Sequence, residues 1–185
     1  MLKSTRVRVI AVMTALVSVL GASAISAQNK YTVKVPGGLA FSEFRGYEGW
    51  QLISISYDGP VMAATLGNPV IIRAYEAGYP GNGKHFPDGS KMAKIHWVPK
   101  KSEALLGAMV PATLHDVDFM VKDSKRFKDS GGWGWGAFEY DTASHSFTPA
   151  TTADKPPQAN DAKCGLGCHT IVQKRDYVFT DYQNR

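Results

Sequence analysis

The chain has 185 residues, 44% of them hydrophobic, and its 21 basic and 16 acidic side chains give a formal net charge of +5. That length is sufficient for one domain with a substantial hydrophobic core. Three basic residues, Lys3, Arg6 and Arg8, lie in an N-terminal segment that we expect to be removed, which leaves a net charge of +2. This small charge, and the lack of a basic stripe with interleaved aromatic residues, argue against nucleic-acid binding.

The N-terminal segment has the pattern of a secretory signal peptide. A basic start is followed by an apolar run at residues 9–24, and no acidic residue precedes Glu43. Cleavage is predicted after Ala27, with the Ala22-Ser23-Ala24 triplet as a second option. A membrane anchor is the alternative, but the apolar run is short for a membrane span and small or polar residues interrupt it. We therefore predict a signal peptide at 1–27 and a single mature domain at 28–185.

The mature chain predicts an α+β fold. Alternating or β-branched patterns predict five strands, at residues 51–57, 69–76, 90–98, 111–122 and 133–140. Short helices are expected at 41–50 and 124–129, and a turn-rich loop at 78–89. Residues 141–160, rich in Thr, Ala and Pro, are expected to form a long connection that brings the cysteine segment to the core. The expected architecture is a mostly antiparallel β-sheet with a few short helices.

Both cysteines lie in the segment Lys163-Cys164-Gly165-Leu166-Gly167-Cys168-His169. Attachment of haem c needs two thiols for the vinyl groups and a histidine beside the second thiol to bind the iron. This segment has them, with three residues between the cysteines in place of the usual two. Residues four apart still share a helix face, and the two glycines give the backbone freedom to absorb the extra residue. The alternatives are a disulfide or a zinc site, although zinc needs further ligands and the other histidines are scattered singly.

Four segments carry a family resemblance. They are Trp50 with the strand after it, Ile72-Arg73, the run Phe86-Pro87-Asp88-Gly89-Ser90-Lys91-Met92-Ala93-Lys94, and the cysteine segment followed by Asp176-Tyr177-Val178-Phe179-Thr180. Together they resemble the cytochrome P-460 family of small periplasmic haem proteins, which is related to cytochrome c′-beta. The most specific of them is Phe-x-Asp-Gly followed five residues later by lysine. The resemblance covers most of the mature chain.

The resemblance implies a periplasmic protein with one covalently bound haem c packed against the sheet. His169 would bind the iron on one side and leave the other open. Lys94 matches a lysine that is bonded to a haem meso carbon. Arg73 matches an arginine of the distal pocket that can hydrogen-bond a nitrogenous ligand, and a surface salt bridge is its alternative role. Such proteins are usually homodimers. They oxidise hydroxylamine and pass the electrons to an acceptor, which we expect to be another periplasmic cytochrome, while related members bind nitric oxide.

The strand pattern is compatible with a lysine that faces the haem. In an extended strand Met92, Lys94 and His96 share one face. From the strand alone, Lys94 would be interpreted as an exposed lysine. The histidines outside the cysteine segment are expected at the surface or in loops, and His96 is notable because it shares the face of Lys94. Trp133 and Trp135 are expected to pack in the core or at a dimer interface.

One departure from the family concerns the proton acceptor. Hydroxylamine-oxidising members have a carboxylate just before the first haem cysteine, and it takes protons from the substrate. Lys163 stands there in this chain, and Asp161 is the candidate replacement. Three functions therefore remain open: oxidation of hydroxylamine, which Lys94 favours; capture of nitric oxide or another small gas without turnover, which Lys163 favours; and a haem-free domain with a Cys164–Cys168 disulfide, which the longer spacing favours.

Overall fold

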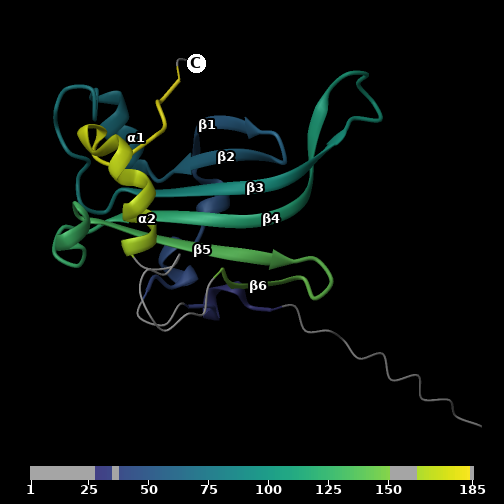
Figure 1. Cartoon of the computed structure of the whole chain (residues 1–185), viewed down its shortest axis with the longest axis horizontal. Helices are drawn as coiled ribbons and strands as arrows, with labels where there is room; N and C mark the ends of the chain where they lie inside the picture. The colour runs from purple at the N-terminus through teal and green to yellow at the C-terminus, as the bar shows by residue number, and fades with distance from the viewer. Residues whose placement is uncertain (1–27, 35–37, 151–161, 184–185) are drawn as a thin grey trace, which may run out of the picture.

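A single six-stranded sheet forms the centre of the fold (Figure 1). The computed structural model describes residues 28–34, 38–150 and 162–183. Neighbouring strands are antiparallel and follow one another in chain order. They are β1 (Gln51–Asp58), β2 (Val61–Gly67), β3 (Lys91–Lys101), β4 (Met109–Lys122), β5 (Trp133–Asp141) and β6 (Ser146–Pro149). The predicted fold class, an α+β fold built on a mostly antiparallel sheet, is confirmed.

Short helices accompany the sheet in the described part of the chain. The α-helices are α1 (Pro69–Glu76) and α2 (Ala162–His169). The 3-10 helices are η1 (Lys30–Thr32), η2 (Phe41–Phe44), η3 (Tyr47–Gly49), η4 (Lys128–Ser130) and η5 (Thr170–Arg175). Among the described residues, no helix combines the length and apolar character needed to cross a membrane. The predicted signal peptide, at residues 1–27, lies outside the described residues.

The prediction of a strand at residues 69–76 was wrong, because this segment forms α1. The Asn68 side chain caps the helix by accepting a hydrogen bond from the backbone N–H of Ile71 at 3.1 Å. Pro69 occupies the first turn, where a missing N–H costs nothing. The buried residues follow a helical spacing: Ile71, Ile72, Ala74 and Tyr75. The β-branched residues suggested a strand, but the cap and the burial of one helix face outweigh that weak preference.

Three further differences concern chain segments outside the predicted strands. No strand was predicted at residues 61–67, where the structure has β2, the partner of β1. The sequence of β2 is so apolar that its alternating burial is hard to see in advance. β6 lies within residues 141–160, which were predicted to be a connection without strands. The helix predicted at residues 124–129 is a turn that leads into the short η4.

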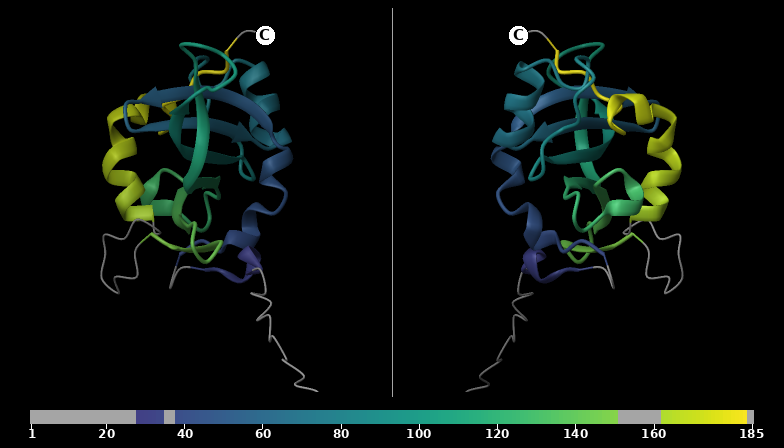
Figure 2. Two further views of the ribbon diagram at one scale, coloured as in Figure 1. Left: turned by 90° about the vertical axis from the view of Figure 1, so that its right-hand side faces the viewer. Right: turned by 90° about the vertical axis from the view of Figure 1, so that its left-hand side faces the viewer.

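Each face of the sheet covers its own apolar cluster. On β3, Met92 and Ala93 point to opposite clusters, and on β4 Met120 and Phe119 do the same. Figure 2 shows the N-terminal 3-10 helices on one side of the sheet and α2 on the other. The first cluster packs the aromatic residues of η2 and η3 against the sheet, and the second packs α1, Trp133 and the C-terminal segment. This alternation confirms that neighbouring residues of β3 face opposite ways.

Candidate functional site

A cavity of about 600 Å³ lies between the sheet and α2. Four cross-strand partners from β2 to β5 form one wall: Thr65, Lys94, Asp118 and Ala137. Apolar side chains enlarge that wall, and Gly165, Cys168 and His169 contribute from α2. The apolar side chains that line the cavity include Met92, Met120, Trp135 and Phe179. A mostly apolar cavity with a few converging polar groups is typical of a cofactor site, and this volume falls in the usual range.

His169 is held in one orientation at the end of α2. Its Nδ1 lies 2.6 Å from the backbone carbonyl oxygen of Tyr177, and because a carbonyl can only accept, Nδ1 carries the proton. Nε2 is therefore left with the lone pair that a metal ion needs. Burial lowers the pKa of His169, and the charge of Lys94 lowers it further, against the raising effect of the Tyr177 hydrogen bond. The neutral imidazole that binds metals is thus favoured.

A buried ion pair fixes the segment that orients His169. The Asp176 side chain, only 1% exposed, accepts hydrogen bonds from Nζ of Lys122 on β4 at 2.7 and 2.9 Å. It also accepts from the backbone N–H of Phe86 at 2.7 Å and pairs with Nδ1 of His85 at 2.9 Å. Asp176 directly precedes Tyr177, so these contacts hold the carbonyl that receives the histidine proton. The contact between Phe86 and Asp176 also joins two of the four segments that carry the family resemblance.

α2 approaches the sheet closely at a glycine. A Cβ added at Gly165 would lie 2.1 Å from Cγ of Trp135 on β5, a distance that real Cβ atoms do not show. Gly165 therefore allows the helix to pack against the tryptophan, in addition to the backbone freedom we expected of it. Cys168, on the same helix, lines the cavity with a free and exposed thiol. The side chain of Cys164 lies outside the described part of the chain.

Comparison with known protein families agrees with this arrangement. The family model for Cytochrome P460 matches residues 44–180, which is most of the chain. The chain belongs to the cytochrome P460 family. No curated protein is matched significantly. Membership in the cytochrome P460 family implies a haem protein, and the cavity has the groups that such a cofactor needs: an oriented imidazole and a thiol on one wall, an amine on the other, and apolar side chains between them.

Not all of the predicted site residues of this cytochrome P460 family member lie at the cavity. Lys94 lines the cavity and is half-buried, on the sheet wall that faces α2. Arg73 is exposed on α1 and is not among the residues that line the cavity. Asp161 lies outside the described residues. The structure therefore brings Lys94 together with Cys168 and His169 around one cavity.

The structure places in the cavity a carboxylate that was not predicted from the sequence. Asp118 lies opposite Lys94 on the neighbouring strand and lines the same wall. Burial, followed by the charge of Asp116, raises the pKa of Asp118 to about 6, against the lowering effects of His96, Lys94 and His115. The available signal was the run His-Asp-Val-Asp-Phe-Met at 115–120, which puts two acids on one face of an otherwise apolar strand.

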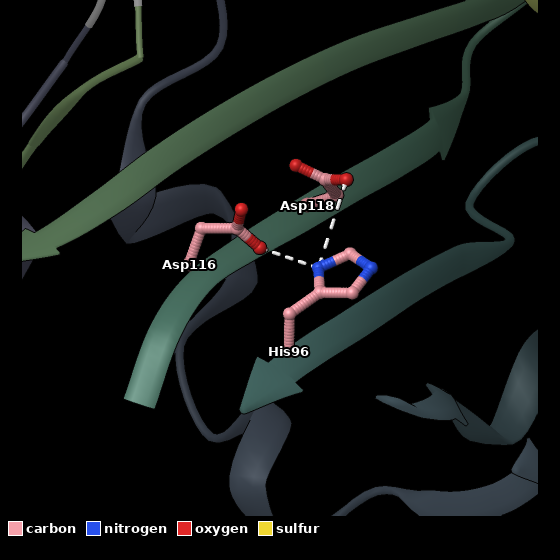
Figure 3. A group of neighbouring side chains, drawn as sticks. All are labelled: His96, Asp116 and Asp118. Carbon is pink, nitrogen blue, oxygen red and sulfur yellow. Dashed lines mark hydrogen bonds and ion pairs between the residues drawn. The ribbon is translucent and has the colours of Figure 1, made fainter. Parts of the chain in front are cut away.

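The structure also corrects the prediction for His96. It is 9% exposed and pairs with Asp116 across β3 and β4, so it is not a surface histidine. His85, His115 and His145 are exposed, as predicted. Trp133 and Trp135 are buried in the second apolar cluster, which agrees with a packing role. Figure 3 shows the His96 ring turned toward two carboxylates, those of Asp116 and Asp118.

Proposed function

We propose that this protein is an exported, mono-haem c-type cytochrome that oxidises hydroxylamine and passes the electrons to a separate periplasmic cytochrome. The observation that carries the proposal is that Lys94 and Asp118 share a cavity with His169. Cys164 and Cys168 would attach the haem, and Nε2 of His169 would bind its iron. Export through residues 1–27 and assembly as a homodimer stay predictions from the sequence.

The transfer of electrons and the transfer of protons in such a reaction would depend on different groups in the cavity. Each N–H or O–H bond broken in hydroxylamine releases one proton and one electron. A haem held by Cys164, Cys168 and His169 would supply the redox chemistry, because it can take up the electrons of the substrate and pass them to the external acceptor. The carboxylate of Asp118 takes the proton, in place of the carboxylate that we expected at Asp161. A pKa of about 6 leaves Asp118 largely ionised at neutral pH, close to the range in which a general base is most effective.

Lys94 is the residue that separates this proposal from simple haem binding. Its side chain projects from the sheet wall toward the haem cavity, opposite the helix that bears His169. In the family the corresponding lysine is bonded to a haem meso carbon, and we propose the same link here. The link would fix the haem against the sheet in addition to its attachment to α2.

The first test is the visible spectrum of the ferrous protein, made in a periplasm with haem-attachment machinery, together with the mass of the denatured chain. We expect the haem to remain attached after denaturation and the Soret band to be strongly red-shifted. The Lys94→Arg variant should keep its haem and show an ordinary Soret band. A denatured chain without haem would overturn the covalent attachment, and an ordinary Soret band in the wild type would overturn the Lys94 link.

The second test is turnover of hydroxylamine with an artificial electron acceptor. Asp118→Asn should lower the rate by about a hundredfold or more, because an amide cannot take up the proton. Asp129→Asn, on the exposed η4, is the matched control and should leave the rate unchanged. Below pH 6 the wild-type rate should fall as Asp118 becomes protonated.

A binder of nitric oxide or another small gas is the second candidate, and Lys163 just before the first haem cysteine favours it. Such a protein would bind nitric oxide in the ferrous state and show no turnover of hydroxylamine at any pH. The Asp118→Asn variant would then bind the gas as the wild type does. Measuring both activities on one preparation therefore separates the two functions.

A further inference from the structure

A histidine lies between two carboxylates at the edge of the cavity (Figure 3). His96 is the cross-strand partner of Asp116, and Asp118 lies two residues along β4 on the same face. Nδ1 of His96 forms a hydrogen bond with Oδ1 of Asp116 and lies 4.0 Å from Oδ2 of Asp118. On its outer side, Asp116 also pairs with Nδ1 of the exposed His115 at 2.8 Å. The paired strands fix the order of these groups from the cavity to the surface.

The pKa values of Asp116 and Asp118 are shifted in opposite directions. Burial alone would raise the pKa of Asp116, but its hydrogen bonds with His96 and His115, and their charges, hold it below its usual value. Asp116 is therefore an anion whenever the protein is near neutral pH. Its negative charge acts on Asp118, which has no hydrogen-bonding partner in the described part of the chain and whose side chain is 49% exposed along the cavity wall.

The other charged groups around Asp118 act in the opposite direction to Asp116. Protonated His96 from β3 and His115 from β4 favour the carboxylate form of Asp118, as does the ammonium of Lys94 before it is bonded to the haem. From α2, His169 faces the same cavity. Of these groups, Asp116 has the largest effect and His96 the next largest. His96 and Asp116, which contact each other, therefore shift the pKa of Asp118 in opposite directions.

We propose that His96 and Asp116 act as positioning residues that set, in opposite directions, the pH range in which Asp118 accepts protons from a ligand in the cavity. His96 stabilises the proton-accepting carboxylate, and Asp116 stabilises its protonated form while holding the His96 ring in place. The inference rests on the proposed function, in which Asp118 is the proton acceptor. It adds the groups that determine when that acceptor works.

The test compares two substitutions in the holo-protein. His96→Gln removes the imidazole, which can carry a positive charge, and keeps a hydrogen-bond donor for Asp116, so the acid limb of the hydroxylamine turnover profile should move to higher pH, by roughly one unit. Asp116→Asn removes the negative charge, so the acid limb should move to lower pH, by a similar amount. His145→Gln, at an exposed histidine, should leave the profile unchanged. A purely structural role for the pair would lower the rate in both variants without opposite shifts, and that result would overturn the proposal.

A second measurement keeps the inference separate from the proposed function. In protein labelled with carbon-13 at the aspartate carboxyls, NMR of the diamagnetic ferrous–carbonyl form follows the ionisation of Asp118 directly, and Asp118→Asn assigns its signal. Opposite shifts of that titration in His96→Gln and Asp116→Asn support the positioning roles even when hydroxylamine is not turned over, in which case the proposed function alone fails. An Asp118 titration that moves in the same direction in both variants, or does not move, overturns the inference.

Discussion

Two carboxylates on the α2 side of the sheet, Asp176 and Asp118, differ in how their charges are compensated. Asp176 is 1% exposed and receives hydrogen bonds from a lysine and a backbone N–H, with a histidine as a further partner. Asp118 is half-exposed toward the cavity, and its neighbour Asp116 is a like charge. A buried charge whose partners are all in place is costly to disrupt, whereas a charge that lacks such partners has a shifted pKa and is available for chemistry. The difference supports a structural role for Asp176 and the proton-accepting role that we propose for Asp118.

The largest expected effect is on stability and comes from Asp176→Asn. This change leaves Lys122 buried without its counter-ion, and breaking a buried pair in this way costs about 3–5 kcal/mol. Urea unfolding of the holo-protein measures the loss. Asp181→Asn is the control, because that carboxylate is 68% exposed and, among the described residues, pairs only with Arg175 at the surface. A loss for Asp176→Asn no larger than the control's would contradict the structural role.

The close approach of α2 to the sheet predicts the next effect. Gly165→Ala would place a methyl group against the Trp135 ring, and overpacking of this kind costs about 1–3 kcal/mol. Gly167→Ala is matched in helix and in chemistry, but nothing in the described part of the chain lies within 4 Å of the added methyl group. It should be neutral or slightly stabilising, since alanine is the better helix former. Thermal unfolding of the two variants checks this, and equal melting temperatures would contradict the packing.

Asp118→Asn should show the reverse of the Asp176 effect. The folded protein holds the pKa of Asp118 at about 6, above its ordinary value of 3.8, so between these values the folded state binds more protons than the unfolded one. Asp118 therefore makes the protein less stable as the pH rises through this range. At pH 7 the asparagine variant should be more stable than the wild type, by up to about 1 kcal/mol after allowance for solvent screening. The gain should vanish below pH 4, and unfolding measured at both pH values tests this.

The smallest expected effect is at His85, the exposed partner of Asp176. His85 contacts Asp176, but its side chain is 75% exposed, and exposed pairs contribute little. His85→Asn should change the free energy of unfolding by less than about 0.5 kcal/mol. A loss comparable with that of Asp176→Asn would mean that the buried pair of Asp176 and Lys122 depends on His85 for its contribution to stability.

The sequence was most informative where one strand could be interpreted alone. The alternation at 91–96 correctly put Met92 and Lys94 on one face, and the pattern at 133–140 correctly predicted a strand with buried tryptophans. At residues 69–76 it failed, because β-branched residues are compatible with both strand and helix, and the cap at Asn68 and the burial of one face decided in favour of the helix.

The parts that depend on strand register could not be predicted from the sequence. Asp118 reaches the cavity because β4 pairs with β3 so that it lies opposite Lys94, 24 residues earlier in the chain. His96 and Asp116 meet for the same reason. Nor does local sequence indicate that the carbonyl of Tyr177 receives the proton of His169, since the chain has to turn back through η5 to bring them together.

The contact between His169 and Tyr177 has a consequence for how this haem segment tolerates change. The ring is oriented from its C-terminal side, by residues anchored to β4, whereas the extra residue of the spacer lies on its N-terminal side. Under the proposed haem attachment, a longer spacer would shift the first cysteine and leave the proposed iron ligand, His169, in place. A designer who wants a different spacing of the thiols should therefore change the helix and keep the turn at Asp176 and Tyr177.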